Sequence, residues 1–198
     1  MSIAVVAEGE ADCRLVVQLA RCFAGLQSGD FERRPAKGRA NISTTAETAM
    51  RLNSVTAGIV LYDLDEDPLP SVDENKVGMV WRLNVVRERS VANAKRLVIG
   101  FCAPAIEAWI LVGLYGYNIS EQAYRSGGLS SSAVRNELKS KLYQTDRPDQ
   151  ARVRNKHPEF CKALEREETV ARLEMAFPEG FAAFIAGLRT LAGPEPAG

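Results

Sequence analysis

Carboxylate side chains gather at the ends of two apolar runs in this chain. The stretch "GIVLYDLDEDP", from Gly58 to Pro68, ends an apolar run in one acidic group, and "IAVVAEGEAD", which begins at Ile3, ends in another. Carboxylates at this density disfavour one another's charged form. A divalent cation would remove that cost, and magnesium, which prefers oxygen ligands and keeps several waters, leaves room for a phosphate. The candidate metal ligands are Glu8, Asp12, Asp63 and Asp65.

The spacing within each group predicts that these side chains converge. Asp63 and Asp65 can point the same way at a strand end, because side chains alternate along a strand. Glu8 ends what should be a neighbouring strand, and Asp12 lies four residues further on, near the start of a helix. Acidic residues are also common in loops and at helix ends. The residues alone therefore leave two interpretations open, a metal site or ordinary loop and cap residues.

The elements that position these acids are predicted from apolar patterning. Continuous apolar runs predict buried strands, at residues 3–8, 57–65 and 96–102. Helical spacing of apolar residues predicts helices, at residues 11–26, 43–53, 73–89 and 105–116, and a short strand with a loop is expected at 31–41. Strands that are apolar on both faces and alternate with helices are typical of an α/β fold with a parallel sheet. In such sheets the working site lies at the carboxyl ends of the strands, where both acidic groups fall.

Length and composition suit one globular domain with an appendage. The chain has 198 residues, of which 46% are hydrophobic and 25% charged, and its formal net charge is zero. We predict a core at residues 1–116, a helical extension packed on it at 117–192 and a frayed tail at 193–198. No stretch approaches the ~20 apolar residues of a membrane span, and the start lacks the basic and apolar segments of a signal peptide. We therefore expect a cytoplasmic protein with no membrane contact.

A few further residues narrow the chemistry. The cysteines form no CxxC pair, which disfavours a zinc site. The single histidine, His157, is expected at the surface, and Trp81 and Trp109 are expected in the core because they lie on apolar helical stretches. A neutral chain lacks the basic footprint typical of a nucleic-acid binder. One local basic group remains, either as a solvated loop or as a nucleic-acid contact: Arg33, Arg34, Lys37 and Arg39.

Several stretches resemble one family. "VVAEGEADCRLV" resembles the TOPRIM motif, in which a strand ends in Glu-Gly and a helix with an early acidic residue follows, and "GIVLYDLDED" is similar to that fold's Asp-x-Asp motif. "APAIEAWILVG", residues 103–113, is similar to a segment of small stand-alone TOPRIM-like bacterial proteins, where a Glu-x-Trp helix follows the third strand. The stretch "FPEGFAAFIAGLRTL" is similar to the closing helix of that group. The resemblance covers most of the chain in patches, with three motifs in order.

The resemblance implies a TOPRIM-like, Rossmann-like parallel sheet and a set of roles. Glu8 matches the family's general acid/base glutamate, and Asp63 and Asp65 match its metal-binding aspartates. Asp12 matches the early helix acid of the overcoming-lysogenization-defect nucleases. Glu107 matches the Glu-x-Trp segment, and we expect it at the same edge of the sheet as Asp63 because it follows the third strand closely. Auxiliary acids of the site are Glu10, Asp67 and Glu107.

The implied activity is magnesium- or manganese-dependent hydrolysis of phosphodiesters in nucleic acid, with Glu8, Asp63 and Asp65 as catalytic residues. The chain lacks the attacking tyrosine of a topoisomerase in an obvious place and the zinc finger of a bacterial primase. The resemblance also implies a partner ATPase in a bacterial anti-phage defence system. A lysine could neutralise charge on the phosphate, and the candidates are Lys95, Lys139, Lys141 and Lys156. A non-catalytic regulatory or partner-binding subunit, an enzyme on small phosphorylated molecules, and a homo-oligomer all stay open.

Overall fold

A single parallel sheet forms the centre of the molecule. The computed structural model describes residues 2–65, 67, 69–70, 78–125 and 132–192. Within them, four strands pair in the order β2-β1-β3-β4, all parallel. Their bounds are β1 Ile3–Ala7, β2 Phe31–Pro35, β3 Ala57–Asp63 and β4 Arg96–Cys102. The apolar runs thus form the α/β core with a parallel sheet that the sequence predicts, and the short strand expected within 31–41 lies at one edge.

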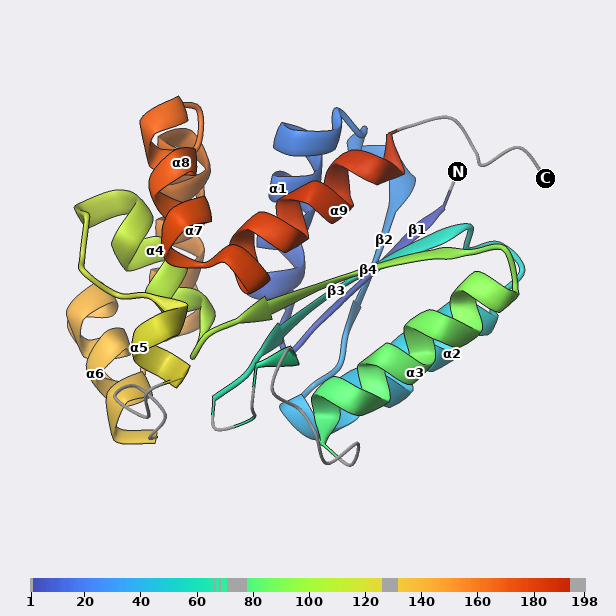
Figure 1. The fold of residues 1–198 in the computed structure, drawn as a ribbon, viewed down its shortest axis with the longest axis horizontal. Helices are drawn as coiled ribbons and strands as arrows, with labels where there is room; N and C mark the ends of the chain where they lie inside the picture. Colours follow the sequence, from blue (N-terminus) through green and yellow to red (C-terminus); the bar gives the residue numbers. More distant parts are fainter. Residues whose placement is uncertain (1, 66, 68, 71–77, 126–131, 193–198) are drawn as a thin grey trace.

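Two pairs of helices cover the two faces of the sheet (Figure 1). One face carries α1, Glu10–Ala24, and the last helix, α9, Ala183–Leu191, and the other carries α2, Ile42–Arg51, and α3, Met79–Ala92. Short turns of helix, at Ser28–Asp30 and Arg39–Asn41, flank β2. Strand β1 is buried at every position and β3 at all but its last residue, because helices lie on both sides. This burial on both faces explains their continuous apolar sequences.

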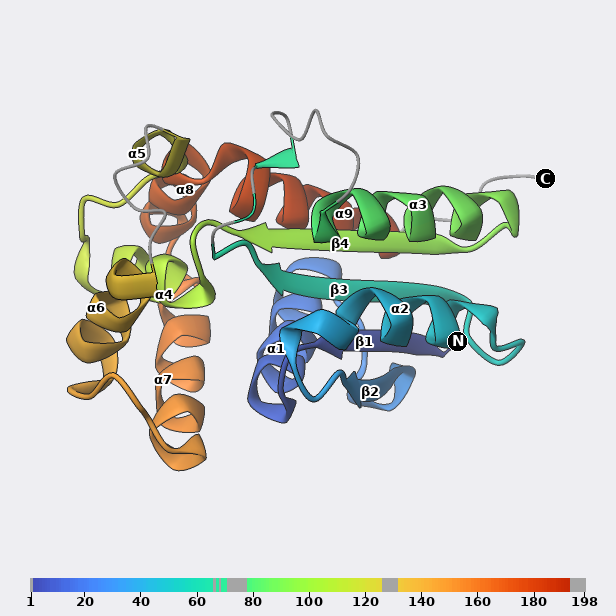
Figure 2. The same ribbon diagram turned by 90° about the horizontal axis from the view of Figure 1, so that it is seen from below.

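The remaining helices form a group beyond the carboxyl ends of the strands, as Figure 2 shows. They are α4 Ile106–Tyr115, α5 Glu121–Arg125, α6 Ser132–Tyr143, α7 Gln150–Ala163 and α8 Glu167–Ala176. Helix α4 is almost wholly buried and packs against α6, α7 and α8. A short π-helical turn, Pro178–Ala182, then returns the chain to the sheet, so that α9 packs on α1 and β4. The helical extension thus begins at one end of the sheet and finishes on its face.

The connections between strands place a crevice at the carboxyl ends of β1 and β3. The chain leaves β1 through α1 toward one edge of the sheet, whereas it passes through α2 and α3 to β3 and β4 toward the other edge. Helices that start from neighbouring strands and cover opposite faces diverge at this point, and α/β sheets bind ligands in the opening that results. Glu8 and Asp63 stand at this switch point, at the ends of β1 and β3.

Several expectations need correction. His157 was expected at the surface, but it is only 3% exposed, because α7 packs against α1. Trp109 is fully buried as expected, whereas Trp81 is 39% exposed on α3 and is not a core residue. The helix expected at 73–89 begins at Met79, with residues 73–77 outside the described chain, as is the tail expected at 193–198. None of the helices in the described ranges is long and apolar enough to cross a membrane.

Candidate metal centre

Asp63 links the end of β3 to the start of α4. It is the last residue of β3, and its Oδ1 accepts a hydrogen bond of 2.9 Å from the backbone N–H of Ile106, the first residue of α4. A carboxylate is favoured there because the first N–H groups of a helix lack partners within the helix. Burial nevertheless raises the pKa of Asp63, and the nearby charge of Glu107 raises it further. Asp63 is therefore fixed in position, while burial and the nearby Glu107 disfavour its charged form.

The acids after β1 approach from the neighbouring strand. Glu8 directly follows β1, and Asp12 lies in the first turn of α1, where its Oδ2 accepts a hydrogen bond of 3.1 Å from the backbone N–H of Gly9. Burial raises the pKa of Asp12 from 3.8 to about 6, against the opposing effect of the Gly9 hydrogen bond, and the charge of Glu8 adds to the rise. The pairing of β1 with β3 brings these acids beside Asp63.

Glu107 is a buried acid that lines the same cavity. It is 5% exposed in the first turn of α4, and burial raises its pKa. The cavity has a volume of about 600 Å³. Its charged and hydroxyl-bearing lining consists of Glu8, Asp12, Lys37, Asp63, Glu107, Arg135, Lys139, Tyr143, Asp146 and Arg147. Glu107 thus lies at the same end of the sheet as Asp63, as expected from its position a few residues after β4.

An arginine from the helical extension lies among these acids. The guanidinium of Arg135, on α6, lies 3.0 Å from Asp65 Oδ2, 3.7 Å from Glu8 Oε2 and 3.9 Å from Asp63 Oδ2. Burial alone would lower the pKa of Arg135, but the surrounding carboxylates outweigh burial and raise it. The sequence did not indicate this residue, because nothing in a polar helix some seventy positions after Asp65 shows which side chain reaches the sheet.

The loop after β3 is held by a second arginine. Asp65 adopts a left-handed backbone conformation with φ 51°, which is uncommon outside glycine. The guanidinium of Arg39 lies 3.4 Å from Asp65 Oδ2 and 2.7 Å from Asp67 Oδ2, and it also donates to the hydroxyl of Tyr62. That hydroxyl donates in turn to Asp67, and the hydroxyl of Tyr124 donates to the carbonyl of Asp65 at 3.1 Å. Arg39 and the two tyrosines therefore fix the position of Asp65.

The basic residues expected together at positions 33–39 lie in three different places in the structure. Lys37 lines the acidic cavity, whereas Arg39 holds the loop after β3. Arg33 lies 3.4 Å from Glu10 Oε1, and Arg34 pairs with Glu32 on β2. Glu10 also pairs with Arg14 at 3.1 Å, so its carboxylate faces basic side chains of α1 and β2. Of the auxiliary acids, Glu107 alone lines the cavity, because Asp67 is held by Arg39 and Tyr62.

The structure also separates the four candidate lysines. Lys139 lines the acidic cavity, one helical turn after Arg135 on α6. Lys141 pairs with Glu137 at 2.5 Å, and Lys156 pairs with Glu159 at 2.9 Å. Lys95 directly precedes β4 and so lies at the amino ends of the strands, away from the acids. Its Nζ donates to the carbonyls of Met50 and Leu52 at 2.8 and 2.7 Å. Lys139 is therefore the lysine that faces the acids.

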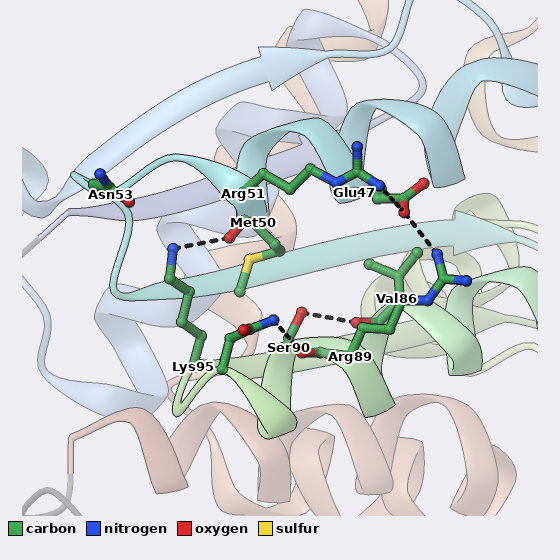
Figure 3. Close-up of a pocket in the computed structure, with 9 residues that line it drawn as sticks. Glu47, Met50, Arg51, Asn53, Val86, Arg89, Ser90 and Lys95 are labelled. Atoms are coloured by element: carbon green, nitrogen blue, oxygen red, sulfur yellow. Dashed lines mark hydrogen bonds and ion pairs between the residues drawn. The ribbon is translucent and has the colours of Figure 1, made fainter.

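Another cavity, of about 680 Å³, lies between α2 and α3 and includes Lys95 in its lining (Figure 3). Its polar side chains engage one another: Glu47 accepts from Arg51 and Arg89, at 2.7 and 2.8 Å. Lys95 closes the carboxyl end of α2 through the two carbonyl contacts, and the hydroxyl of Ser90 donates to the Val86 carbonyl at 2.8 Å. Of these contacts, the Glu47–Arg89 pair joins α2 to α3, and Glu47 is the one acid in the described lining, so this cavity does not bring acids together for chemistry.

The acids at the switch point suit a hard divalent cation in their chemistry. All are oxygen donors, and two of their buried oxygens, Asp65 Oδ1 and Glu107 Oε2, have no hydrogen-bond partner in the described chain. Buried polar atoms without partners are uncommon and point to a missing ion or water. In the arrangement described, however, no three Asp, Glu, His or Cys side chains of the described ranges form a group that could hold a metal. The guanidinium of Arg135 lies between Glu8, Asp63 and Asp65, so a shared ion requires it to move.

Comparison of the chain with protein-family models, with curated proteins and with solved structures found no match. The assignment of the fold therefore rests on the structure itself: a four-stranded, all-parallel sheet in the order β2-β1-β3-β4, flanked by helices and consistent with a Rossmann-like α/β fold.

Proposed function

We propose that this protein is a TOPRIM-type enzyme that hydrolyses phosphodiester bonds of nucleic acid with magnesium or manganese. The observation that carries the proposal is the group of acids in the cavity at the switch point, Glu8, Asp12, Asp63 and Glu107. Asp65 does not line this cavity but contacts its Arg135 at 3.0 Å, and one buried oxygen each of Asp65 and Glu107 has no partner in the described chain. Asp63 and Asp65 would hold the cation, with Glu8 and Asp12 beside them. When bound, the ion would activate water and neutralise charge that develops on the phosphate.

The protein's own residues would position the metal ligands, bind the phosphate and exchange protons. Asp63 is held by the α4 backbone and Asp65 by Arg39, so the two ligands are positioned by contacts that do not have to break when an ion binds. With a divalent cation to neutralise these acids, Arg135 would no longer be needed among them. Arg135 and Lys139 then offer two cations to a phosphate in the same cavity. Glu8, whose side chain is 41% exposed, is accessible to exchange protons with solvent.

A second candidate function follows from the same arginine. Arg135 already bridges Glu8, Asp63 and Asp65, as a permanent counter-ion would. In this alternative the chain is a non-catalytic regulatory or partner-binding subunit that keeps the fold, with or without a metal, and turns over no substrate. A partner ATPase and a role in anti-phage defence belong to either proposal and rest on the resemblance of the motifs alone.

Cleavage assays separate the two functions. Labelled single-stranded and duplex DNA, and the matching RNAs, are incubated with the wild-type protein in Mg²⁺, Mn²⁺ or EDTA. We expect cleavage that requires the metal and is lost in Asp63→Asn. Glu88→Gln, which changes an exposed acid of α3, is purified in the same way and should cleave like the wild type. Equal cleavage by Asp63→Asn and the wild type would show that the acids around Asp63 do not catalyse it, and absence of cleavage with every substrate supports the non-catalytic subunit.

Lys139 offers a second test within the same assay. We expect Lys139→Ala to lower kcat about a hundredfold, as loss of one charge-stabilising group does in other enzymes. Lys162→Ala, which removes an exposed lysine of α7, should leave kcat unchanged. Equal kcat values for the two variants would show that Lys139 does not act on the phosphate.

A further inference from the structure

Two tyrosines are exposed together at the end of α4. Tyr115, the last residue of that helix, is 51% exposed, and Tyr117, two residues later, is 40% exposed. Their ring centroids are 6.4 Å apart and their planes are nearly perpendicular, at 82°. Gly116 between them has φ 68°, which ends the helix and turns the chain so that both rings lie on one side. An adjacent pair of exposed aromatic rings adds little to the core and offers a surface to a ligand.

Cationic side chains surround this pair. The Nζ of Lys141 lies 5.8 Å from the ring centroid of Tyr117, and the Nζ of Lys156 donates to the Tyr115 hydroxyl at 3.1 Å. The guanidinium of Arg152 lines the same cavity, of about 700 Å³, and donates to the backbone carbonyl of Tyr143. The described lining carries three cations and one carboxylate, Glu159. Two of the cations already have acidic partners, because Lys156 pairs with Glu159 at 2.9 Å and Lys141 with Glu137 at 2.5 Å, so a phosphate on this surface competes with those carboxylates. Aromatic rings interleaved with cations suit an anionic polymer whose subunits have flat faces.

The surface adjoins the acidic cavity. Tyr143 lines both cavities, and its buried hydroxyl has no hydrogen-bond partner in the described chain. Helix α6 contributes to both as well, with Arg135 and Lys139 on the acidic side and Lys141 beside Tyr117. A polymer with one phosphate in the acidic cavity can therefore continue past Tyr143 onto the tyrosine pair.

We propose that Tyr115 and Tyr117 form a stacking platform for bases of a single-stranded segment of nucleic acid, with Lys141, Arg152 and Lys156 along its phosphates. The bases of a duplex already stack on one another, whereas an unpaired base presents a free face to an aromatic ring. The inference deepens the proposed function, because it names single-stranded nucleic acid, or a duplex with a single-stranded end, as the substrate class. The platform itself requires no catalysis.

The test measures binding in EDTA, where hydrolysis cannot occur. Fluorescence anisotropy follows a short labelled oligodeoxythymidine, the matching oligouridine and a blunt duplex. The variants are a double substitution, Tyr115→Ala with Tyr117→Ala, and its aromatic counterpart, Tyr115→Phe with Tyr117→Phe. Trp81→Ala removes an equally exposed aromatic ring from α3 and serves as the matched control. Thermal melts establish that each variant is folded.

We expect the wild type to prefer single strands to the blunt duplex, with an affinity that falls as salt rises. The double alanine variant should bind single strands about tenfold more weakly, and the double phenylalanine variant within about twofold of the wild type, because stacking needs the ring and not the hydroxyl. Trp81→Ala should bind like the wild type. Equal affinities of the double alanine variant and the wild type, an equal loss in both double variants, or no binding of single strands by the wild type would each overturn the platform.

The result is independent of the cleavage assay. Metal-dependent cleavage with single-strand affinity that does not depend on the tyrosines refutes the platform and leaves the proposed hydrolysis standing. Tyrosine-dependent binding without cleavage under any metal refutes the hydrolysis and leaves the platform standing.

Discussion

Removing the charge of Asp12 should stabilise the metal-free protein. Burial raises the pKa of this carboxyl from 3.8 to about 6. A group with a raised pKa in the folded state contributes stability below its unfolded pKa, and this stability is lost as the pH rises through the folded pKa. The charged form therefore costs stability at neutral pH. Asparagine cannot ionise, and its side-chain oxygen can still accept the Gly9 N–H that Asp12 now accepts at 3.1 Å.

The magnitude follows from the two pKa values. The difference of roughly two units corresponds to about 3 kcal/mol of unfolding free energy at about pH 7.5, and to only about 1 kcal/mol at about pH 4.5, where the unfolded carboxyl is partly protonated. We therefore expect Asp12→Asn to stabilise the protein in EDTA, by about 3 kcal/mol at the higher pH and about 1 kcal/mol at the lower.

Urea unfolding at both pH values measures the difference. The control is Asp149→Asn, because Asp149 caps α7 through the Arg152 N–H at 2.8 Å but is exposed. Asparagine and aspartate are nearly equal as caps, so we expect a change below about 0.5 kcal/mol at either pH. An Asp12→Asn variant that is less stable than the wild type in EDTA, or whose gain does not grow with pH, would show that this acid belongs to a satisfied structural network.

Three further changes test other parts of the structure. Arg39→Ala removes the pair with Asp67 at 2.7 Å and frees the loop after β3, so calorimetry should find about tenfold weaker Mn²⁺ binding. Arg33→Ala, which removes a surface pair, should bind Mn²⁺ like the wild type, and equal Mn²⁺ affinities of the two variants would contradict the role of Arg39. Gly180→Ala would place a Cβ 2.4 Å from the Phe101 carbonyl oxygen, and urea unfolding should show a loss of about 1–3 kcal/mol; an unchanged midpoint would refute this. Burial lowers the pKa of His157 from 6.5 to about 4. The wild type should therefore lose about 3 kcal/mol of unfolding free energy from this group as the pH falls from the higher of these pKa values to the lower. His157→Gln should lack this loss, and an equal dependence of unfolding free energy on pH in the two proteins would contradict the reasoning.

The central elements could be predicted from the sequence because their signals are local. Strands β1, β3 and β4 are buried on both faces, so their continuous apolar runs identify them without tertiary knowledge. The meeting of Glu8 and Asp63 follows from topology, because parallel strands end at one edge of a sheet. Glu107 could be placed for the same reason, since it follows β4 within a few residues.

The residues that were missed depend on how distant elements dock. Arg135 reaches the acids because α6 packs against α4, and no local pattern specifies that contact. The basic group at 33–39 reads as one patch, but its side chains leave a strand edge and a turn in different directions, so Arg39 turns toward Asp67 while Arg33 meets Glu10. His157 precedes Pro158, a residue that usually ends helices, yet Pro158 lies inside α7 and the histidine is buried where α7 meets α1.

The presence of a divalent cation among the acids at the switch point is tested most directly by anomalous diffraction from crystals soaked in manganese. We expect an anomalous peak within coordination distance of Asp63 and Asp65, with the guanidinium of Arg135 displaced from its position 3.0 Å from Asp65. Crystals of Asp63→Asn, soaked in the same way, should lack the peak. A wild-type map with no peak at this edge of the sheet, and with Arg135 still bridging Glu8, Asp63 and Asp65, would contradict the metal centre and favour the non-catalytic subunit.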